Sequence, residues 1–589
     1  MSEKYTVTNY SVESLLTYIK NDEIAVPEIQ RPFVWSGKQV RDLIDSLYNG
    51  YPTGYLIMWQ NSNVQLRNGE TSLGKKILID GQQRVTALMT AIVGREILTA
   101  KYDRKVIRIA FNPLATDKEE RFAVTTPTHK NSRMWIDDIS KVFAANFSQR
   151  RFINQYLNDN PDADEDAVEL AMNQLIAIKT CQLGVIQLAP DLSIDEVTEI
   201  FVRVNSQGKH LNEADFAMSK IAADGLHDGS NLRKAIDYFC RLIADDSFYS
   251  QIENGDAEFM ASEYAQKISW LRNGVDRIYA PDYSDMLRVS FMSAFNRGKI
   301  SGLVDLLSGR DFEHRTFREE IVEKSFSALS DGVSSFVSDY NFKQFILAIK
   351  SVGFVSPKLL NSNMTLDFAY TLYLILQRSN EVPKTEIKRY VQKWFVLTTL
   401  TGRYTNSPES QMDRDLREIA DKGFFKFFSE NDLSFWDETF WEVTLVQNLE
   451  TTSTSSPYFN VYLAAQIFFS DHAILSTARV VDLITIVGDV HHIFPKEYLR
   501  EHGNASRMQV ANCAYLDRPL NILIGRKAPR EYFSKALENY SDENDFIKNL
   551  EENCIPLEIL DMTHEDYAEF LEQRRRLMAH KIQKYYASL

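Results

Sequence analysis

The sequence predicts an α+β protein with several domains. The chain has 589 residues, which is too long for a single hydrophobic core and indicates two to four domains. Strand-like and helical segments alternate over the first 225 residues, whereas helical periodicity dominates from there to about residue 400. We therefore expect an α/β domain at 1–225, a helical connecting region at 226–400 and a mostly helical C-terminal domain at 401–589.

The N-terminal domain carries clear start and stop signals. Ser36 and Gln39 have the spacing of a capping box, and Gly50 follows the end of the helix that they begin. Apolar residues of that helix recur on one face, at Val40, Leu43, Ile44 and Leu47. A second capping box is formed by Ser193 and Glu196. Strands are expected at 55–59, 76–80, 106–111 and 183–188.

Two C-terminal segments have distinct patterns. The polar stretch at 451–460 is rich in Ser and Thr and is expected to form a surface loop. The tail at 564–589 is expected to form a helix with Phe570, Leu577 and Ile582 inward and a basic face outward.

The composition excludes several classes of protein. No apolar run approaches the roughly 20 residues that a membrane helix needs, and the N-terminus lacks the basic start and apolar core of a signal peptide. The four cysteines are far apart and form no C-x-x-C pair, which argues against a cysteine zinc site or a disulfide framework. We therefore expect a cytoplasmic protein with no membrane partner.

The net charge limits how the protein can bind nucleic acid. There are 66 Lys and Arg residues against 81 Asp and Glu, for a formal charge of −15. Such a balance disfavours indiscriminate binding to a phosphate backbone. If the protein acts on DNA or RNA, its basic residues must be clustered in one region, and its binding to the nucleic acid must be selective or gated.

The stretch "ILIDGQQRVTALMTAIVG" predicts a strand-to-helix turn with the features of an anion site. Gly81 allows a tight turn, and the helix after it begins with unpaired N–H groups at the positive end of its dipole. Arg84 adds a bidentate donor for phosphate, and Gln82 and Gln83 add neutral donors. Asp80 would repel phosphate unless it holds a metal or a hydroxyl, or positions Arg84. From spacing alone, a phosphate site and a buried structural turn explain the pattern equally well.

Two other segments place polar residues near expected turns. "VPEIQRPFVWS" has Gln30 and Arg31 directly before a proline, and "FVRVNSQGKHLNEADF" has Arg203 and Asn205 before Gly208. Each alone is commonplace, because an arginine on a helix is usually a solvated charge and N-S-Q-G is usually only a turn.

The second polar cluster is "DVHHIFP", with Asn512 and Asn521 downstream. Adjacent strand residues face opposite ways, so His491 and His492 can serve one site only if the strand ends or bends, as Pro495 allows. Phosphodiester hydrolysis needs a base and a cation, and these residues suit it with His492 as base, His491 and Asn521 as metal ligands and Asn512 as a brace of the loop. A polar pair at a strand end with no catalytic role is the open alternative.

Three N-terminal segments resemble, in order and spacing, the ParB-like domain of GmrSD-type modification-dependent (type IV) restriction proteins: P-E-I-Q-R-P-F-V-W, I-D-G-Q-Q-R-V-T-A-L and F-x-R-x-N-x-x-G-x-x-L. The resemblance covers about 1–225 and implies a nucleotide-binding, NTP-hydrolysing site. The residues that it places at the nucleotide are Asp80, Gly81, Gln82, Gln83 and Arg84, with Gln30 and Arg31 as neighbours. Arg203 and Asn205 are weaker candidates.

The C-terminal pattern is similar to the HNH (ββα-metal) nuclease motif of the same proteins, over roughly 400–589. H-H-I-F-P is followed by two asparagines nine residues apart. The resemblance implies that His491 and Asn521 hold Mg²⁺ or Mn²⁺, and that the catalytic set is His492, His491, Asn512 and Asn521. His491 stands where an aspartate is frequent, which leaves the metal preference open. The basic residue that often follows the second asparagine is displaced to Arg526 or Lys527.

Together the two resemblances imply a phage-defence endonuclease that cuts or nicks modified DNA under NTP control. Its partners would be DNA and a nucleoside triphosphate, and a homodimer is left open. A nucleotide-gated DNA-binding switch with a non-catalytic HNH fold is the alternative, and an RNase acting on host RNA is a third. Arg403 is expected either to contact DNA or to pair with a nearby acid.

Overall fold

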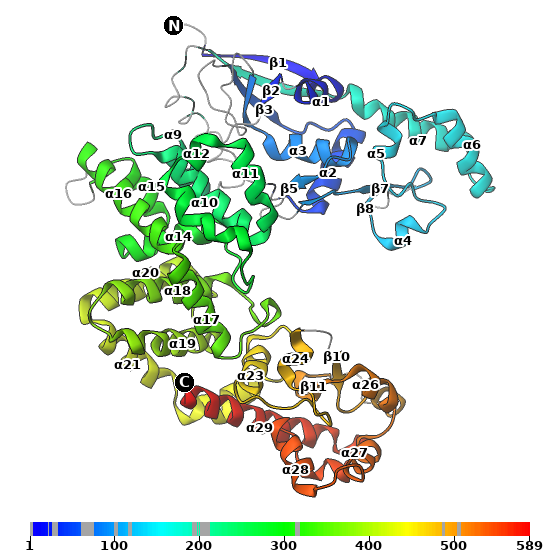
Figure 1. Ribbon diagram of the computed structural model, residues 1–589. Helices are drawn as coiled ribbons and strands as arrows, with labels where there is room; N and C mark the ends of the chain where they lie inside the picture. The colour runs from blue at the N-terminus through cyan, green and yellow to red at the C-terminus, as the bar shows by residue number, and fades with distance from the viewer. Residues whose placement is uncertain are drawn as a thin grey trace. The chain divides into compact units, whose positions relative to one another are not determined.

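The computed structural model describes residues 4–21, 23–25, 33, 35–60, 76–98, 104–115, 121–190, 192, 197, 200, 213–311, 318–485, 489–503 and 508–589. The fold is α+β and multidomain, as predicted (Figure 1). The chain divides into two compact units, Met1–Gln266 and Lys267–Leu589. The three domains with boundaries near 225 and 400 remain a prediction.

The first unit is built on a five-stranded mixed sheet with the order β1-β9-β3-β4-β2. Its strands are β1 (Tyr5–Ser11), β2 (Ile24–Ala25), β3 (Tyr55–Gln60), β4 (Lys76–Asp80) and β9 (Gln182–Leu188). The pairs β1–β9 and β3–β4 are antiparallel, whereas β3–β9 and β2–β4 are parallel. In this register Ile57 lies opposite Asp80, so the end of β4 meets the first half of β3.

Three of the four predicted strands are found, and the fourth is shorter than predicted. The strand expected at 106–111 begins only at Ile109, as β7 (Ile109–Phe111), and pairs with β8 (Phe122–Val124). The reason is local: the Ile107 N–H donates to the Thr90 hydroxyl at 2.9 Å and is therefore not part of a strand ladder. A further pair is β5 (Ile97–Leu98) with β6 (Arg104–Lys105).

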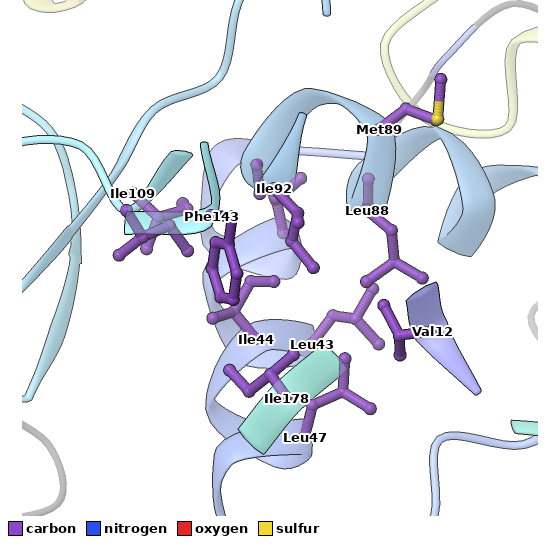
Figure 2. Packing of buried hydrophobic residues seen from close by; sticks show 14 of the residues in the cluster. Val12, Leu43, Ile44, Leu47, Leu88, Met89, Ile92, Ile109, Phe143 and Ile178 are labelled. Atoms are coloured by element: carbon purple, nitrogen blue, oxygen red, sulfur yellow. The ribbon is translucent and has the colours of Figure 1, made fainter. Parts of the chain in front are cut away.

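Three helices, α1 (Val12–Lys20), α2 (Gly37–Tyr48) and α3 (Gln82–Ile92), contribute to the core beside the sheet, for example through Val12, Leu43 and Leu88 (Figure 2). Alternation along β3 divides its side chains between two faces, because Leu56 and Met58 join this core whereas Ile57 and Trp59 join a smaller cluster with Leu188. Ser36 caps α2 through the predicted capping box, and the four predicted apolar residues of α2 are buried. The capping box predicted at Ser193 and Glu196 lies outside the described residues.

The first unit has further helices among its described residues. These helices are α4 (Pro127–Lys130), α5 (Ser140–Phe143), α6 (Gln149–Asp159), α7 (Glu165–Ala177), α9 (Glu213–Ala223), α10 (Gly229–Ala244), α11 (Tyr249–Gly255), α12 (Ala257–Met260) and α13 (Glu263–Ile268), the last of which crosses into the second unit.

The second unit begins with a helical array. Its helices are α14 (Tyr283–Phe295), α15 (Ser301–Leu307), α16 (Glu319–Phe336), α17 (Asp339–Ser351), α18 (Asn363–Arg378), α19 (Lys384–Thr401), α20 (Pro408–Lys422) and α21 (Phe424–Phe435). Buried Arg288 of α14 binds Asp367 of α18 at 2.6 Å and so joins these two helices. Of the two expectations for Arg403, the ion pair is the one found: two of its nitrogens donate to buried Asp415, at 2.8 and 2.6 Å.

The remaining C-terminal elements surround one short hairpin. The hairpin strands are β10 (Asp489–His492) and β11 (Cys513–Leu516). The helices are α22 (Leu445–Asn448), α23 (Pro457–Phe468), α24 (Val480–Thr485), α25 (Lys496–Glu501), α26 (Arg518–Ile524), α27 (Pro529–Leu537), α28 (Glu543–Glu552) and α29 (Tyr567–Ser588), with a π-helical segment at Phe440–Thr444 before α22.

Two C-terminal predictions were partly wrong. The loop predicted at 451–460 ends earlier, because Pro457 takes the first position of α23, where its missing N–H costs nothing. The tail is a helix, but Leu577 is 42% exposed and Arg574 is fully buried. The buried stripe of α29 follows a spacing of four residues, through Phe570, Arg574, Met578 and Ile582, and this stripe leaves Leu577 on its flank.

Within the described part of the chain, no helix is both long and apolar enough to cross a membrane.

Candidate functional site

The strand-to-helix turn at residues 80–84 has the predicted geometry. β4 ends at Asp80, Gly81 adopts a left-handed conformation with φ 95°, and α3 starts at Gln82. A Cβ at Gly81 would lie 2.2 Å from Leu56 Cδ2, so both the backbone angle and the packing require glycine here. Gly81 has no side chain that could cap α3, and the first turn of the helix lies at the positive end of its dipole.

Arg84 is held in place by the neighbouring strand. One of its terminal nitrogens donates to the Tyr55 carbonyl at 2.6 Å, and the other lies 3.8 Å from the Asp80 carboxylate. Burial lowers the pKa of Arg84, and the Asp80 charge partly opposes that effect. Of the roles that the sequence left open for Asp80, this geometry matches the positioning of Arg84. The Tyr55 carbonyl is a partner that the sequence pattern did not reveal, since nothing local relates β3 to α3.

Four of the sequence-predicted residues cannot be placed relative to this turn. Gln30, Arg31, Arg203 and Asn205 all lie outside the described residues. Gln82 and Gln83 are both half-buried at the start of α3. The structure therefore brings together Asp80, Gly81, Gln82, Gln83 and Arg84 as one turn.

The second candidate site is formed by two antiparallel strands and the helix that follows them. His491 of β10 lies opposite Ala514 of β11, and His492 lies opposite Cys513. β10 ends at His492, and the chain bends before Pro495 begins α25, as the sequence suggested. The helix after β11 is α26.

This arrangement brings His491 and Asn521 into contact. Nδ1 of His491 lies 2.8 Å from the side-chain oxygen of Asn521. Since the amide oxygen only accepts, Nδ1 carries the proton of this hydrogen bond. His491 is 4% exposed, and its burial lowers its pKa to about 4 despite the bond to Asn521. The imidazole is therefore neutral at physiological pH.

The pair has the donor types of two metal ligands. An imidazole nitrogen and an amide oxygen both bind divalent ions, and an ion held by Nδ1 of His491 and the Asn521 oxygen would replace the proton that joins them in the hydrogen bond. Nε2 of His491 is buried and has no hydrogen-bond partner in the described ranges. In the same ranges, no group of three or more His, Cys, Asp or Glu residues could hold a metal. Among the described side chains, His491 and Asn521 are the pair that would hold an ion here, and water or phosphate oxygens would take its other coordination positions.

His492 is the less buried histidine of the pair. Its side chain is half-buried, and its pKa is lowered mainly by burial and also by the charge of Lys496. A histidine with a lowered pKa is unprotonated at neutral pH and can accept a proton from water.

Asn512 fixes the bend that follows His492. It is fully buried; its side-chain oxygen accepts from the Phe494 N–H at 2.7 Å, and its side-chain nitrogen donates to the Phe494 carbonyl at 2.9 Å. The Asn512 carbonyl also accepts from the Ile493 N–H at 2.8 Å, and the Tyr532 hydroxyl donates to the Ile493 carbonyl at 2.6 Å. Hydrogen bonds therefore fix the backbone N–H and carbonyl groups of both residues that follow His492.

The outer surface of α26 and the turn after it combines apolar and basic side chains. Ile522 and Leu523, next to Asn521, are 74% and 68% exposed. No acidic residue occurs from 518 to 530, and the basic residues of this range are all exposed: Arg518, Arg526, Lys527 and Arg530. The sequence pattern pointed to Arg526 and Lys527, but it did not predict that Ile522 and Leu523 are exposed. The surface is a local basic surface on a chain of net charge −15.

Comparison with known proteins gives two matches. Residues 12–222 match the family described as GmrSD restriction endonuclease, N-terminal domain. An uncharacterized protein of Methanocaldococcus jannaschii is 20% identical over an alignment of 647 positions, which covers 98% of this chain and 99% of that protein. The family match includes the turn at 80–84 and four of the five strands of the sheet, all except β1. It supports a restriction protein of the GmrSD type, a class of endonuclease whose substrate is DNA.

Proposed function

We propose that this protein is a modification-dependent DNA endonuclease with an HNH-type cleavage site in its C-terminal region and a regulatory nucleotide site in its N-terminal domain. The observation that carries the proposal is the convergence of His491 and Asn521, with His492 adjacent, on a strand–strand–helix unit. The match of residues 12–222 to a restriction endonuclease family supports the same class of activity.

In this mechanism His492 is the general base. Its lowered pKa favours the neutral imidazole, which takes a proton from the water that attacks the phosphodiester. His491 and Asn521 would hold a divalent cation, Mg²⁺ or Mn²⁺, which when bound supplies positive charge to the phosphate oxygens. Asn512 positions His492 by holding Ile493 and Phe494.

The surface of α26 is the proposed DNA contact. Arg526 pairs with Glu501 at 3.3 Å, but both side chains are largely exposed, so the pair is weak and the guanidinium can turn to a phosphate. Lys527 is exposed beside it. Ile522 and Leu523 would then lie against sugars or base edges between the basic contacts.

The N-terminal turn is the proposed NTP site. Arg84 and the first N–H groups of α3 would bind phosphate oxygens, and Gly81 permits their close approach. Arg84 is already oriented by Tyr55 and Asp80, so binding would not have to order a free side chain.

A plasmid assay tests the proposal. Unmodified, hydroxymethylated, glucosylated and phosphorothioated plasmids are incubated with Mg²⁺ or Mn²⁺, with and without ATP or GTP, beside His492→Ala and an EDTA control. We expect metal-dependent nicking or cutting of one modified plasmid, lost in His492→Ala by about 10²- to 10⁴-fold. Retained NTP binding with no cleavage of any DNA would instead favour a nucleotide-gated binding switch, and a parallel RNA substrate tests for an RNase.

A further inference from the structure

Arg574 of α29 is a fully buried arginine without an acidic partner in the described part of the chain. All of its hydrogen bonds go to backbone carbonyls. One terminal nitrogen donates to Ala511 O at 2.5 Å and to Cys513 O at 2.8 Å. Nε and the other terminal nitrogen donate to Asn553 O, at 3.4 and 3.2 Å. A single guanidinium therefore joins the tail helix to the two residues on either side of Asn512.

These contacts connect Arg574 to the proposed cleavage site in two steps. Asn512, between the two clamped carbonyls, binds both backbone groups of Phe494 and the N–H of Ile493. Ile493 and Phe494 are the residues directly after His492, where β10 ends and the chain bends. Cys513, whose carbonyl Arg574 holds, is the strand partner of His492.

Packing alone does not account for an arginine at this position. The other members of the buried stripe of α29 are apolar: Phe570, Met578 and Ile582. An apolar residue at 574 would avoid the cost of burying a charge, which neutral carbonyls offset less well than a carboxylate does. What the guanidinium adds is a planar, fixed array of donors that holds several carbonyls at defined positions.

We propose that Arg574 is a positioning residue of the nuclease site: it holds Ala511 and Cys513, and through Asn512 it sets the position of His492. The inference rests on the proposed function, because it assigns Arg574 to the same site. Among the described residues, the hydrogen bonds of Arg574 go to Ala511, Cys513 and Asn553 and to neither histidine, so it acts through Asn512.

The test uses the full-length chain with Arg574→Met, Arg574→Lys and the control Lys581→Met. Lys581 is a cation on the same helix whose side chain is 11% exposed; it donates to Glu552 O at 2.6 Å and pairs with Asp471, so its loss weakens α29 packing without removing a hydrogen bond to Ala511 or Cys513. All variants are studied well below their melting temperatures. Backbone hydrogen exchange is followed in peptides covering 489–495 and 508–516, together with Mn²⁺ binding and the kcat and KM of DNA cleavage.

We expect faster exchange in those two peptides for Arg574→Met, a kcat lower by about 10- to 100-fold with an unchanged KM, and weaker Mn²⁺ binding. Arg574→Lys should restore part of the wild-type behaviour in each measurement, because an ammonium group can still donate to the carbonyls. If Arg574→Met does not fold, Arg574→Lys alone tests the proposal. Lys581→Met should lower the melting temperature only.

Wild-type exchange and kcat in both Arg574 variants would overturn the inference and leave the nuclease in place. Equal losses of kcat in Lys581→Met would also overturn it, by reducing Arg574 to a packing role. A wild-type protein that neither binds Mn²⁺ nor cleaves any DNA would overturn the proposed function, and the assignment of Arg574 to it as well.

Discussion

The imidazole of His491 and the side-chain amide of Asn521 are 2.8 Å apart, although 30 positions of sequence separate the two residues. The hairpin makes this contact possible, because β11 pairs with β10 and then leads through Asp517 into α26, which carries Asn521. His491 is buried and neutral there, and its burial lowers its pKa to about 4 although the hydrogen bond to Asn521 opposes that shift.

The contribution of His491 to the stability of the protein should therefore decrease as the pH falls from about 6.5 to about 4. The unfolded chain takes up a proton at His491 below its ordinary pKa of about 6.5, whereas the folded protein does so only near 4. Neutral His491 contributes its full stabilisation above about pH 6.5. This contribution is lost as the pH falls through the pKa of His491 in the folded protein, and the free energy of unfolding decreases by about 3 kcal/mol at most. Urea denaturation at pH 7 and pH 4.5 measures the free energy of unfolding at the two pH values. His491→Gln should have a shallower dependence, and the exposed control His580→Gln should follow the wild type.

Changes at Asn521 should alter metal affinity in opposite directions. Asn521→Asp adds a negative charge to a pair that otherwise offers one imidazole and one amide, so Mn²⁺ should bind about tenfold more tightly. Asn521→Ala removes one of the two ligands and should weaken binding by at least as much. Calorimetric titration of Mn²⁺ into the DNA-free protein provides the affinities. If both variants bind Mn²⁺ like the wild type, the ion is held elsewhere.

The basic surface of α26 predicts a change in the salt dependence of DNA binding. Each phosphate contact contributes about 0.9 to the slope of log affinity against log salt concentration. Arg526→Ala and Lys527→Ala should each weaken DNA binding and reduce the slope by about 1. Binding is measured with Ca²⁺ in place of the catalytic metal, at several salt concentrations. Arg576→Ala, which removes an exposed arginine paired with Glu572 on α29, should leave the slope unchanged.

Arg84→Ala should weaken nucleotide binding and leave the fold intact. A charge-assisted hydrogen bond to phosphate contributes about 1.5–3 kcal/mol, which corresponds to roughly a 10- to 100-fold loss of affinity. Titration of a fluorescent, non-hydrolysable GTP or ATP analogue measures it. The matched control is Arg108→Ala, which removes an arginine of the same unit that pairs with Asp138 at 3.2 Å. Unchanged affinity in Arg84→Ala would remove the phosphate site from the turn at 80–84.

Gly81→Ala should be far more costly than Gly50→Ala. Both glycines have positive φ, of 95° and 69°, so an alanine is strained at either position by about 1 kcal/mol. At Gly81 the added Cβ would also meet Leu56 Cδ2 at 2.2 Å, whereas at Gly50 nothing lies within 4 Å. The crowding adds about 1–3 kcal/mol to the loss of unfolding free energy at Gly81, which urea denaturation of the two variants resolves. Similar losses would show that the turn can relax.

The parts that the sequence predicted well are those set by neighbours along the chain. The capping box of Ser36 and Gln39 and the turn at Gly81 depend on backbone groups within four residues, so residue type and spacing are enough. The end of β10 at His492 likewise follows from a proline three residues on. The predicted start of this strand at residue 106 was wrong, because the Ile107 N–H donates to the hydroxyl of Thr90, which is 17 residues away along the chain.

The sequence by itself determined the α+β class, the helical character of the tail and the residue types at both candidate sites. Only the tertiary structure decided which of those residues meet. Arg84 binds the Tyr55 carbonyl because β3 and β4 are neighbours, and Arg574 faces inward because the carbonyls of Ala511 and Cys513 lie beside α29. Helical periodicity shows which residues share one face of a helix. Whether a charged residue can lie on the buried face depends on hydrogen-bond acceptors that are far away along the chain.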